Sequence, residues 1–582
     1  MSMTPGGPTN GPEYLDGPGP ADMAPADSGV PADDTRKRLI ALGAVVAGGA
    51  VIAGGAWAAT SFFATGAQPA EALPASTVGY LSVDLDPSGG QKIEAIQTLR
   101  KFPGLREEMD LQADDDLRER LFEEVLKSSA CEGIDFADDI EPWLGSRAAF
   151  AAVDLGDDEP APVGVIQVSD AGQAEDGVSK LVETCGAETD GDAGGWVVDG
   201  DWMVVAETEE IAQQVVDAAE GSTLAADSSF QRWTGEAGDD GFMSMYVAKG
   251  VTKYVEDLGG MGLMGLPGAS LGMTPDAAGS AAFDEECLEE ATTAEEIDAC
   301  FSATDDTSSD PGAEEVPEEL QQMINDFDGA AATVRFDDGA VEVEYAMSNY
   351  NSDMTRFMDS AEGVDMLAGL PDDTVAAFGF ALEEGWAEAM LDYVKTLAPD
   401  EAATIDEQLA QFETETGLAF PEDVETLLGD GVTVSMGGGL DPDAVANGGP
   451  EEVPAGIRIK GDADEIQAVL DKISAQAGPE AAEFLQVTEG DGFAVLALQD
   501  DYRGALESSG SLGDSSAYSE VVEDDEAQSV LYVDFNADDD WLVRLTGDSP
   551  DVSENLEPLG AFGVSGWVDD EVVHGLVKLT TD

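Results

Sequence analysis

The chain has 582 residues, 43% of them hydrophobic, so it is long enough for two or three domains and apolar enough to form a core. Its 123 acidic residues outweigh 24 basic residues and give a formal net charge of −99. Because nucleic acids and anionic lipid headgroups are bound through Lys and Arg, this balance excludes a nucleic-acid-binding protein. It leaves two interpretations of the charge: solubility in salt, or capture of cations and basic peptides.

The N-terminal part predicts a disordered tail and one membrane span. Residues 1–38 are rich in Pro, Gly and Asp and cannot bury enough apolar surface to fold. Leu39–Phe63 contains no charge, and a helix of this length is about 37 Å long, enough to cross a hydrocarbon core of about 30 Å. The cations Arg36, Lys37 and Arg38 precede it and mark the cytoplasmic side. We expect the tail inside the cell and the bulk of the chain outside; a signal peptide cut after Ala58 is the alternative.

A linker, residues 64–72, leads to a strand, a turn and a helix over Leu73–Leu105. The distinctive residues are Leu73-Pro74, Thr77, the turn Asp84–Pro87, Gln91-Lys92 and Phe102-Pro103. With these residues the chain resembles the domain-of-unknown-function 3352 family of bacterial, mainly actinobacterial, membrane-anchored proteins. The resemblance extends over most of residues 65–582. It implies membrane anchoring and architecture, and it assigns no catalytic residue.

The chain also resembles itself. Gly133–Gly145 aligns with Gly417–Gly429 without a gap, and Asp227–Phe230 returns at Asp514–Tyr518 in the same order. This pattern predicts a tandem duplication. Its parts are a first repeat at 73–350 with an insertion at 250–325, a connector at 351–369 and a second repeat at 370–582.

Both repeats show the same order of strand and helix patterns. The elements predicted for the first are a strand at Val78–Leu85, helices at Ile93–Leu99 and Leu117–Lys127, strands at Ala148–Val153 and Val163–Val168, a helix at Ala174–Glu183, strands at Trp196–Val198 and Trp202–Ala206, and a hairpin of Ala331–Phe336 with Val341–Met347. For the second they are a strand at Val375–Leu382, helices at Trp386–Leu397 and Thr404–Glu415, strands at Val432–Met436 and Gly456–Ile459, a helix at Glu465–Ala475, strands at Phe484–Val487 and Phe493–Leu498, and a hairpin of Phe562–Val568 with Val572–Leu579. Adjacent strands between helix pairs indicate an α+β fold, a mainly antiparallel sheet covered by helices.

The insertion begins with an uncharged segment rich in glycine and methionine, Leu258–Met273. Its large apolar residues are Leu258, Met261, Leu263, Met264, Leu266, Leu271 and Met273. Exposed methionines on a pliable backbone make an adaptable apolar surface for a protein or lipid partner. The alternative is that the segment folds onto its own sheet.

The four cysteines, Cys131, Cys185, Cys287 and Cys300, suit two disulfides in an exported protein, with three possible pairings. We favour Cys287–Cys300 because these two are close in sequence, which leaves Cys131–Cys185. No zinc-type spacing is present.

Two motifs suggest chemistry but lack the context that it requires. Gly268–Gly272 fits the GxSxG nucleophile elbow, yet the only histidine, His574, lies on the last predicted hairpin, where a packed or half-exposed histidine is expected. Gly260–Gly265 fits GxGxxG, yet no helix-forming run follows to receive a phosphate. We predict no catalytic residue and no cofactor.

Acidic residues suggest metal or acid–base sites only weakly. Asp139 with Glu141, and Asp423 with Glu425, are two residues apart, so they point to different sides of a helix and are interpreted as helix-start residues. Asp84–Gly89 and Asp190–Gly195 resemble incomplete calcium loops, which leaves weak calcium binding open. No dedicated metal site is predicted.

The sequence therefore predicts a single-pass membrane protein with its bulk outside the cell, acting as a non-enzymatic binding or interaction module of the bacterial envelope. An envelope hydrolase using carboxylates and an acidic surface for cations or basic peptides are the alternatives.

Overall fold

The structure is a computed structural model that describes residues 67–84, 95, 97–104, 118–119, 122, 133–157, 159–185, 194–238, 241–254, 325–337, 339–348, 362–383, 385–397, 402–440, 450–477, 484–522, 527–545, 550–569 and 572–582. The predicted tail, the predicted span Leu39–Phe63 and the apolar segment Leu258–Met273 lie outside these residues. Within the described part, no helix has both the length and the apolar character needed to span a membrane.

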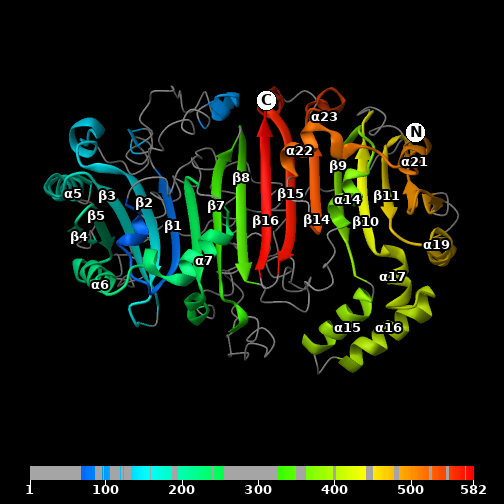
Figure 1. Cartoon of the computed structure of the whole chain (residues 1–582), viewed down its shortest axis with the longest axis horizontal. Helices are drawn as coiled ribbons and strands as arrows, with labels where there is room; N and C mark the ends of the chain where they lie inside the picture. The colour runs from blue at the N-terminus through cyan, green and yellow to red at the C-terminus, as the bar shows by residue number, and fades with distance from the viewer. Residues whose placement is uncertain are drawn as a thin grey trace, which may run out of the picture.

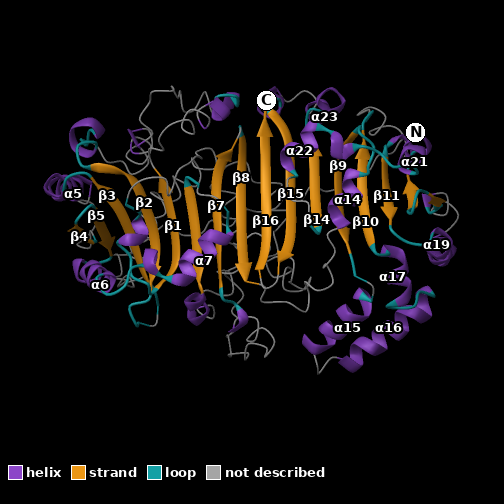
Figure 2. Ribbon diagram, viewed as in Figure 1, coloured by secondary structure: helices purple, strands orange, loops and turns teal. Residues whose placement is uncertain are grey.

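The described strands form one antiparallel sheet of 16 strands (Figures 1 and 2). They are β1 (Thr77–Asp84), β2 (Leu144–Val153), β3 (Ala161–Val168), β4 (Gly195–Asp199), β5 (Trp202–Ala206), β6 (Met243–Ala248), β7 (Gly329–Asp337), β8 (Ala340–Ser348), β9 (Thr374–Ala381), β10 (Gly431–Gly437), β11 (Ala455–Ile459), β12 (Thr488–Glu489), β13 (Ala494–Ala497), β14 (Ser529–Asp534), β15 (Leu559–Asp569) and β16 (Val572–Thr581). Their order across the sheet is β12-β13-β11-β10-β9-β14-β15-β16-β8-β7-β6-β1-β2-β3-β5-β4. The predicted α+β class with an antiparallel sheet is confirmed.

The strand order is the same in both halves of the chain when each is followed outward from the centre. β8-β7-β6-β1-β2-β3-β5-β4 on one side corresponds to β16-β15-β14-β9-β10-β11-β13-β12 on the other. The halves join where β16 pairs with β8, and Leu576 lies opposite Glu344 at the middle of that pairing. Because like strands meet there antiparallel, a local two-fold axis passes through this pair.

Local details repeat with the strands. Thr77 donates its hydroxyl to the Pro74 carbonyl at 2.7 Å, and Thr374 donates to Pro371 at 2.8 Å. Each bond closes the turn that precedes the first strand of its half. We therefore compare residues in the two halves through the strand registers.

Helices cover the two sides of the sheet unequally. They are α5 (Ala171–Cys185), α6 (Glu209–Ala219), α7 (Ser228–Glu236), α14 (Glu362–Ala368), α15 (Trp386–Leu397), α16 (Ala402–Thr416), α17 (Glu422–Leu428), α19 (Ala463–Ala477), α21 (Asp500–Leu506), α22 (Ser516–Val521), α23 (Ala537–Leu545) and α24 (Pro550–Leu556), with short turns at Pro69–Glu71, Phe136–Ile140, Leu224–Ala226, Lys249–Tyr254, Pro450–Glu452 and Leu512–Asp514. α6, α7, α14, α21 and α22 pack on one side, here the helix side, with α7, α14 and α22 in front of the strands in Figure 1. α5, α17, α19 and α23 pack on the opposite side, here the far side, at or near its two ends.

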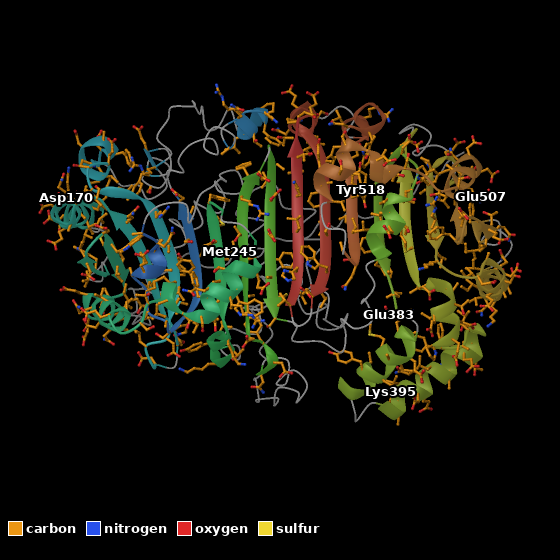
Figure 3. The ribbon with its side chains drawn as sticks, viewed as in Figure 1. Asp170, Met245, Glu383, Lys395, Glu507 and Tyr518 are labelled. Atoms are coloured by element: carbon orange, nitrogen blue, oxygen red, sulfur yellow. The ribbon has the colours of Figure 1, made fainter. Side chains whose placement is uncertain are left out.

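Aromatic pairs hold α7 and α22 on the helix side. Phe230 of α7 meets Tyr246 of β6 edge-on, with ring centroids 5.1 Å apart. The ring centroid of Tyr518 of α22, labelled in Figure 3, lies 5.3 Å from that of Tyr532 of β14. These are the residues of the repeated Asp227–Phe230 pattern and the strand that follows it, so the pattern marks one helix-to-sheet contact in each half.

One predicted strand is wrong. Phe484–Val487 is not a strand, and the strand is the short Thr488–Glu489. Leu485 and Val487 have the apolar alternation of a strand, but they pack against the cluster under α19, and the Val487 N–H donates to the Gln467 side chain at 2.8 Å instead of to a neighbouring strand.

Candidate functional site

A row of apolar side chains crosses the far side of the sheet. Directly paired residues on six neighbouring strands form it; we call it the apolar row. From β10 to β8 its members are Val434, Phe378, Leu531, Val564, Val577 and Val343. Because paired residues on neighbouring strands lie on the same side of a sheet, these six side chains form one continuous strip.

The strip is accessible at its β9 and β10 end. Phe378 is 43% exposed and Val434 is 46% exposed, which is unusual for large apolar side chains on a central strand. The other four residues are half-buried. In the described part of the chain, none of the six belongs to a core cluster. Exposed apolar surface of this kind marks interaction sites in soluble domains.

Helices cover the rows on either side of the apolar row at this end. Trp541 and Leu542 of α23 pack with Ala376, Met436 and Val533. On the other flank, the cluster under α17 and α19 includes Phe380 and Val432, and the ring of Phe380 lies 5.6 Å from that of Phe378. At its β9 and β10 end the row is therefore a narrow strip between two packed borders.

The first half contains the corresponding row, in which none of the described large apolar side chains is exposed. Through the two-fold register it consists of Phe150, Leu81, Met245, Ala332, Tyr345 and Gly575. Leu81 and Met245 pack against a cluster of Ala95, Phe242, Met243 and Phe336. The Tyr345 ring lies so close to Gly575 that a Cβ there would sit 2.2 Å from it, so a side chain at this position would have to displace the ring. The two halves are thus alike in backbone but differ in whether this surface is covered.

The two halves also differ in where the helix after the first strand packs. In the first half, Ala95 of this helical segment lies on the row. In the second half, α15 packs against α16 and α17 instead, away from the sheet in Figure 1. Lys395 of α15 forms an ion pair with Asp406 of α16 at 2.6 Å, and the Gly385 N–H donates to Glu425 at 2.5 Å. These contacts fix α15 beside α16 and α17.

The helix side carries buried charges where the halves meet. Glu342 is almost fully buried and lies 2.7 Å from Arg335 and 2.8 Å from Lys578 of the other half. Arg335 also pairs with Glu344 at 2.7 Å. Burial acts to lower the pKa of Arg335, but the two carboxylates outweigh burial and raise it. The cluster is internally paired, which suits a structural joint.

His574 lies beside this joint. It is buried and stacks on Trp567, with ring centroids 5.2 Å apart and planes 8° from parallel. Its Nε2 lies 4.0 Å from a Glu236 carboxylate oxygen. The packed interpretation of this histidine is confirmed.

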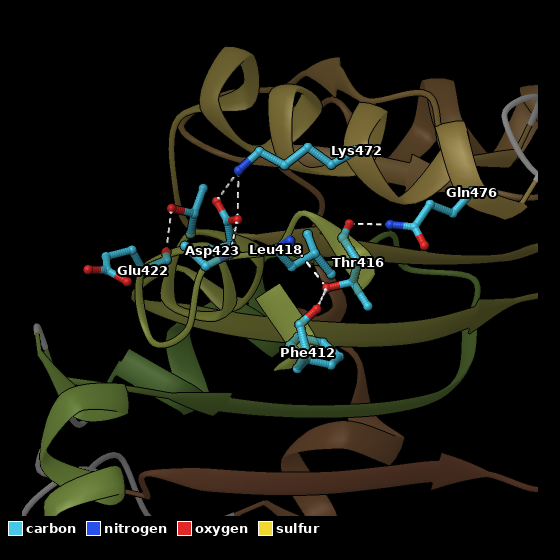
Figure 4. A network of polar contacts seen from close by, with 9 residues as sticks. Phe412, Thr416, Leu418, Glu422, Asp423, Lys472 and Gln476 are labelled. Carbon is cyan, nitrogen blue, oxygen red and sulfur yellow. Dashed lines mark hydrogen bonds and ion pairs between the residues drawn. The ribbon is translucent and has the colours of Figure 1, made fainter. Parts of the chain in front are cut away.

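The repeated carboxylates have a structural role in both halves. Asp139 accepts the Asp135 N–H and pairs with Lys180 of α5 at 2.5 Å. Asp423 accepts the Ala419 N–H at 2.6 Å and pairs with Lys472 of α19 at 2.6 Å, as Figure 4 shows for the lysine. Hydrogen bonding to Lys180 lowers the pKa of Asp139; burial acts to raise the pKa of Asp423, but the bonds to Lys472 and Ala419 outweigh it and lower that pKa.

This second network continues along the end of α16. Thr416 accepts a hydrogen bond from Gln476 at its carbonyl, and its hydroxyl donates to the Phe412 carbonyl at 2.6 Å and accepts the Leu418 N–H at 3.2 Å (Figure 4). The sequence pattern predicts helix-start roles for Asp139 and Asp423 but not their lysine partners.

The remaining sequence candidates form no site within the described residues. Asp84, of the first calcium-like loop, is buried beside Arg147, 3.6 Å away. Cys185 ends α5, whereas Cys131, Cys287, Cys300 and both glycine motifs lie outside the described residues. No group of three or more potential metal ligands occurs within the described ranges. The disulfide pairings stay predictions.

The family comparison concerns the first half of the chain. Residues 39–259 match the family model described as "Protein of unknown function (DUF3352)". Over these residues the resemblance to the DUF3352 family is confirmed. The match starts at the first residue of the predicted span and ends shortly after Tyr254, so it includes β1 to β6. No curated protein and no solved structure matches the chain.

Proposed function

We propose that this protein is a membrane-anchored, extracytoplasmic binding module without enzymatic activity, built from two repeats, that holds an apolar ligand on the far side of its sheet. The observation that carries the proposal is the apolar row, with Phe378 and Val434 exposed at its end. Burying a phenylalanine side chain stabilises a protein by about 1.5–3 kcal/mol, and an exposed phenylalanine lacks this free energy. A ligand that covers the row recovers this free energy.

The predicted anchor supports the same proposal. The family match begins at Leu39, where the uncharged segment starts, so the segment belongs to the family's own unit. A helix at this position would keep the sheet close to a membrane surface, where apolar ligands and membrane proteins are concentrated.

The test uses the full chain purified from membranes in mild detergent. Phe378→Asp is compared with Phe412→Asp, which alters the same residue type at a similar exposure, 41%, on α16. We expect the first variant to lose the lipid or apolar partner that accompanies the unchanged protein, and the second to retain it. Identical sets of co-purifying molecules in all three preparations would contradict the proposal.

The predicted contact through Leu258–Met273, outside the described residues, is tested separately. Deleting this segment should remove a further protein or lipid partner while ligand binding on the row remains. If the deletion leaves every co-purifying molecule unchanged, this loop has no partner role.

A further inference from the structure

The apolar row has the dimensions of a single extended chain. Six strands separated by about 4.8 Å give a length of about 24 Å from Val434 to Val343. This length exceeds the depth of one membrane leaflet, which is about 15 Å, half of a hydrocarbon core of about 30 Å. A long alkyl chain lying across the strands would therefore contact apolar side chains along its whole length.

The width of the row favours a narrow ligand. On β9 the packed residues Ala376 and Phe380 flank Phe378. They are four positions apart, so the strand between them is about 13 Å long. The flanking side chains and the helices α19 and α23 take up part of that width. Since a helix with its side chains measures about 10–12 Å across, the strip suits one narrow chain better than a helical partner.

Charge also restricts the ligand. The chain carries a net charge of −99, so a second copy and an anionic head group are both repelled. An uncharged or zwitterionic head group avoids this repulsion. The corresponding row of the first half is already filled, with Leu81 and Met245 packed and Tyr345 over Gly575. Among the described residues, large apolar side chains on this row are exposed only in the second half.

From these observations we infer that the protein binds one long, unbranched alkyl chain with an uncharged or zwitterionic head group, lying across β10 to β8 on the far side of the sheet. The inference rests on the proposed function and specifies its ligand class and its stoichiometry.

The experiment measures binding of palmitoyl lysophosphatidylcholine to the full chain, below the micelle concentration of the probe, by native mass spectrometry and fluorescence titration. We expect one bound molecule per chain, and binding weaker by about tenfold or more for the octanoyl analogue, because each methylene withdrawn from water adds to affinity. Phe378→Asp and Val434→Asp should each weaken palmitoyl binding by about tenfold. Phe412→Asp and Val552→Asp, with similarly exposed side chains away from the row, should leave it unchanged.

Three outcomes would overturn the inference. Two equivalent bound molecules would show that the first-half row also binds the ligand. Equal affinity for the palmitoyl and octanoyl chains would show that the alkyl chain does not lie along the row. A dimer of the unchanged protein that Phe378→Asp converts to monomer would make a second copy the occupant. In each case a different apolar ligand could still be lost from Phe378→Asp during purification, so failure here is distinct from failure of the proposed function.

Discussion

Single carboxylates tie the far-side helices to neighbouring helices and turns, and Asp423 of α17, which pairs with Lys472 of α19, is the clearest case. Its carboxylate is held by Lys472 and the Ala419 N–H, so its folded pKa lies below the ordinary value of 3.8. A lowered carboxyl pKa stabilises the folded state above the unfolded pKa, and the gain is lost as pH falls through the folded pKa.

Asp423→Asn is therefore expected to lower the free energy of unfolding by about 1 kcal/mol at neutral pH. The difference from the unchanged protein should shrink as pH falls below 3.8. Urea titrations at several pH values measure this, and Asp139→Asn, the counterpart in the first half, should show the same direction of change. A destabilisation that is constant over the whole pH range would assign the effect to packing instead.

Residue-level prediction from sequence succeeded where a pattern was local. The repeated Gly133–Gly145 motif marks the elements that hold Asp139 and Asp423 in equivalent places. Their lysine partners lie 41 and 49 positions away, where no local spacing connects them. The exposure of Phe378 is likewise not readable from local sequence. The apolar alternation around it predicts the strand β9, but whether its side chain is exposed depends on where α15 packs.

Among the elements, the β16 to β8 pairing is the joint of the molecule. It places Lys578 of one half beside Glu342 of the other inside the sheet. Lys101 adds a link by donating to the Thr581 carbonyl at 2.8 Å. The sequence indicated a sheet in each repeat, but nothing in either strand specifies that the two edges pair, so the single continuous sheet was not predicted.

Lys578→Met tests this joint. Removing one partner of a buried pair leaves Glu342 with Arg335 alone, and we expect a loss of about 3 kcal/mol in the free energy of unfolding. Combining it with Glu342→Gln should restore part of the loss, since the unpaired charge is then removed. Additive losses in the double variant would mean that the two side chains do not interact across the joint.

At the scale of the whole molecule, 123 acidic residues against 24 basic ones give strong self-repulsion. The melting temperature of the purified protein should therefore rise with added sodium chloride, which screens the repulsion. Repeating the series at about pH 4, where many carboxylates are partly protonated, should give a smaller rise. A melting temperature indifferent to salt at neutral pH would contradict this account of the charge.

The apolar row also belongs to this scale. Its six residues come from six strands between positions 343 and 577, and they meet only through the sheet order. No periodic pattern within one segment could reveal it. The apolar contact predicted from the sequence is Leu258–Met273, because a sequence pattern reveals only contiguous apolar segments.

The most direct test is photo-crosslinking of the full chain with a lysophosphatidylcholine whose alkyl chain carries a diazirine, followed by peptide mapping. The account predicts labelling on β9, β10 and β14, lost in Phe378→Asp and kept in Phe412→Asp. Labelling confined to α16, to Leu258–Met273 or to the first-half strands would contradict it.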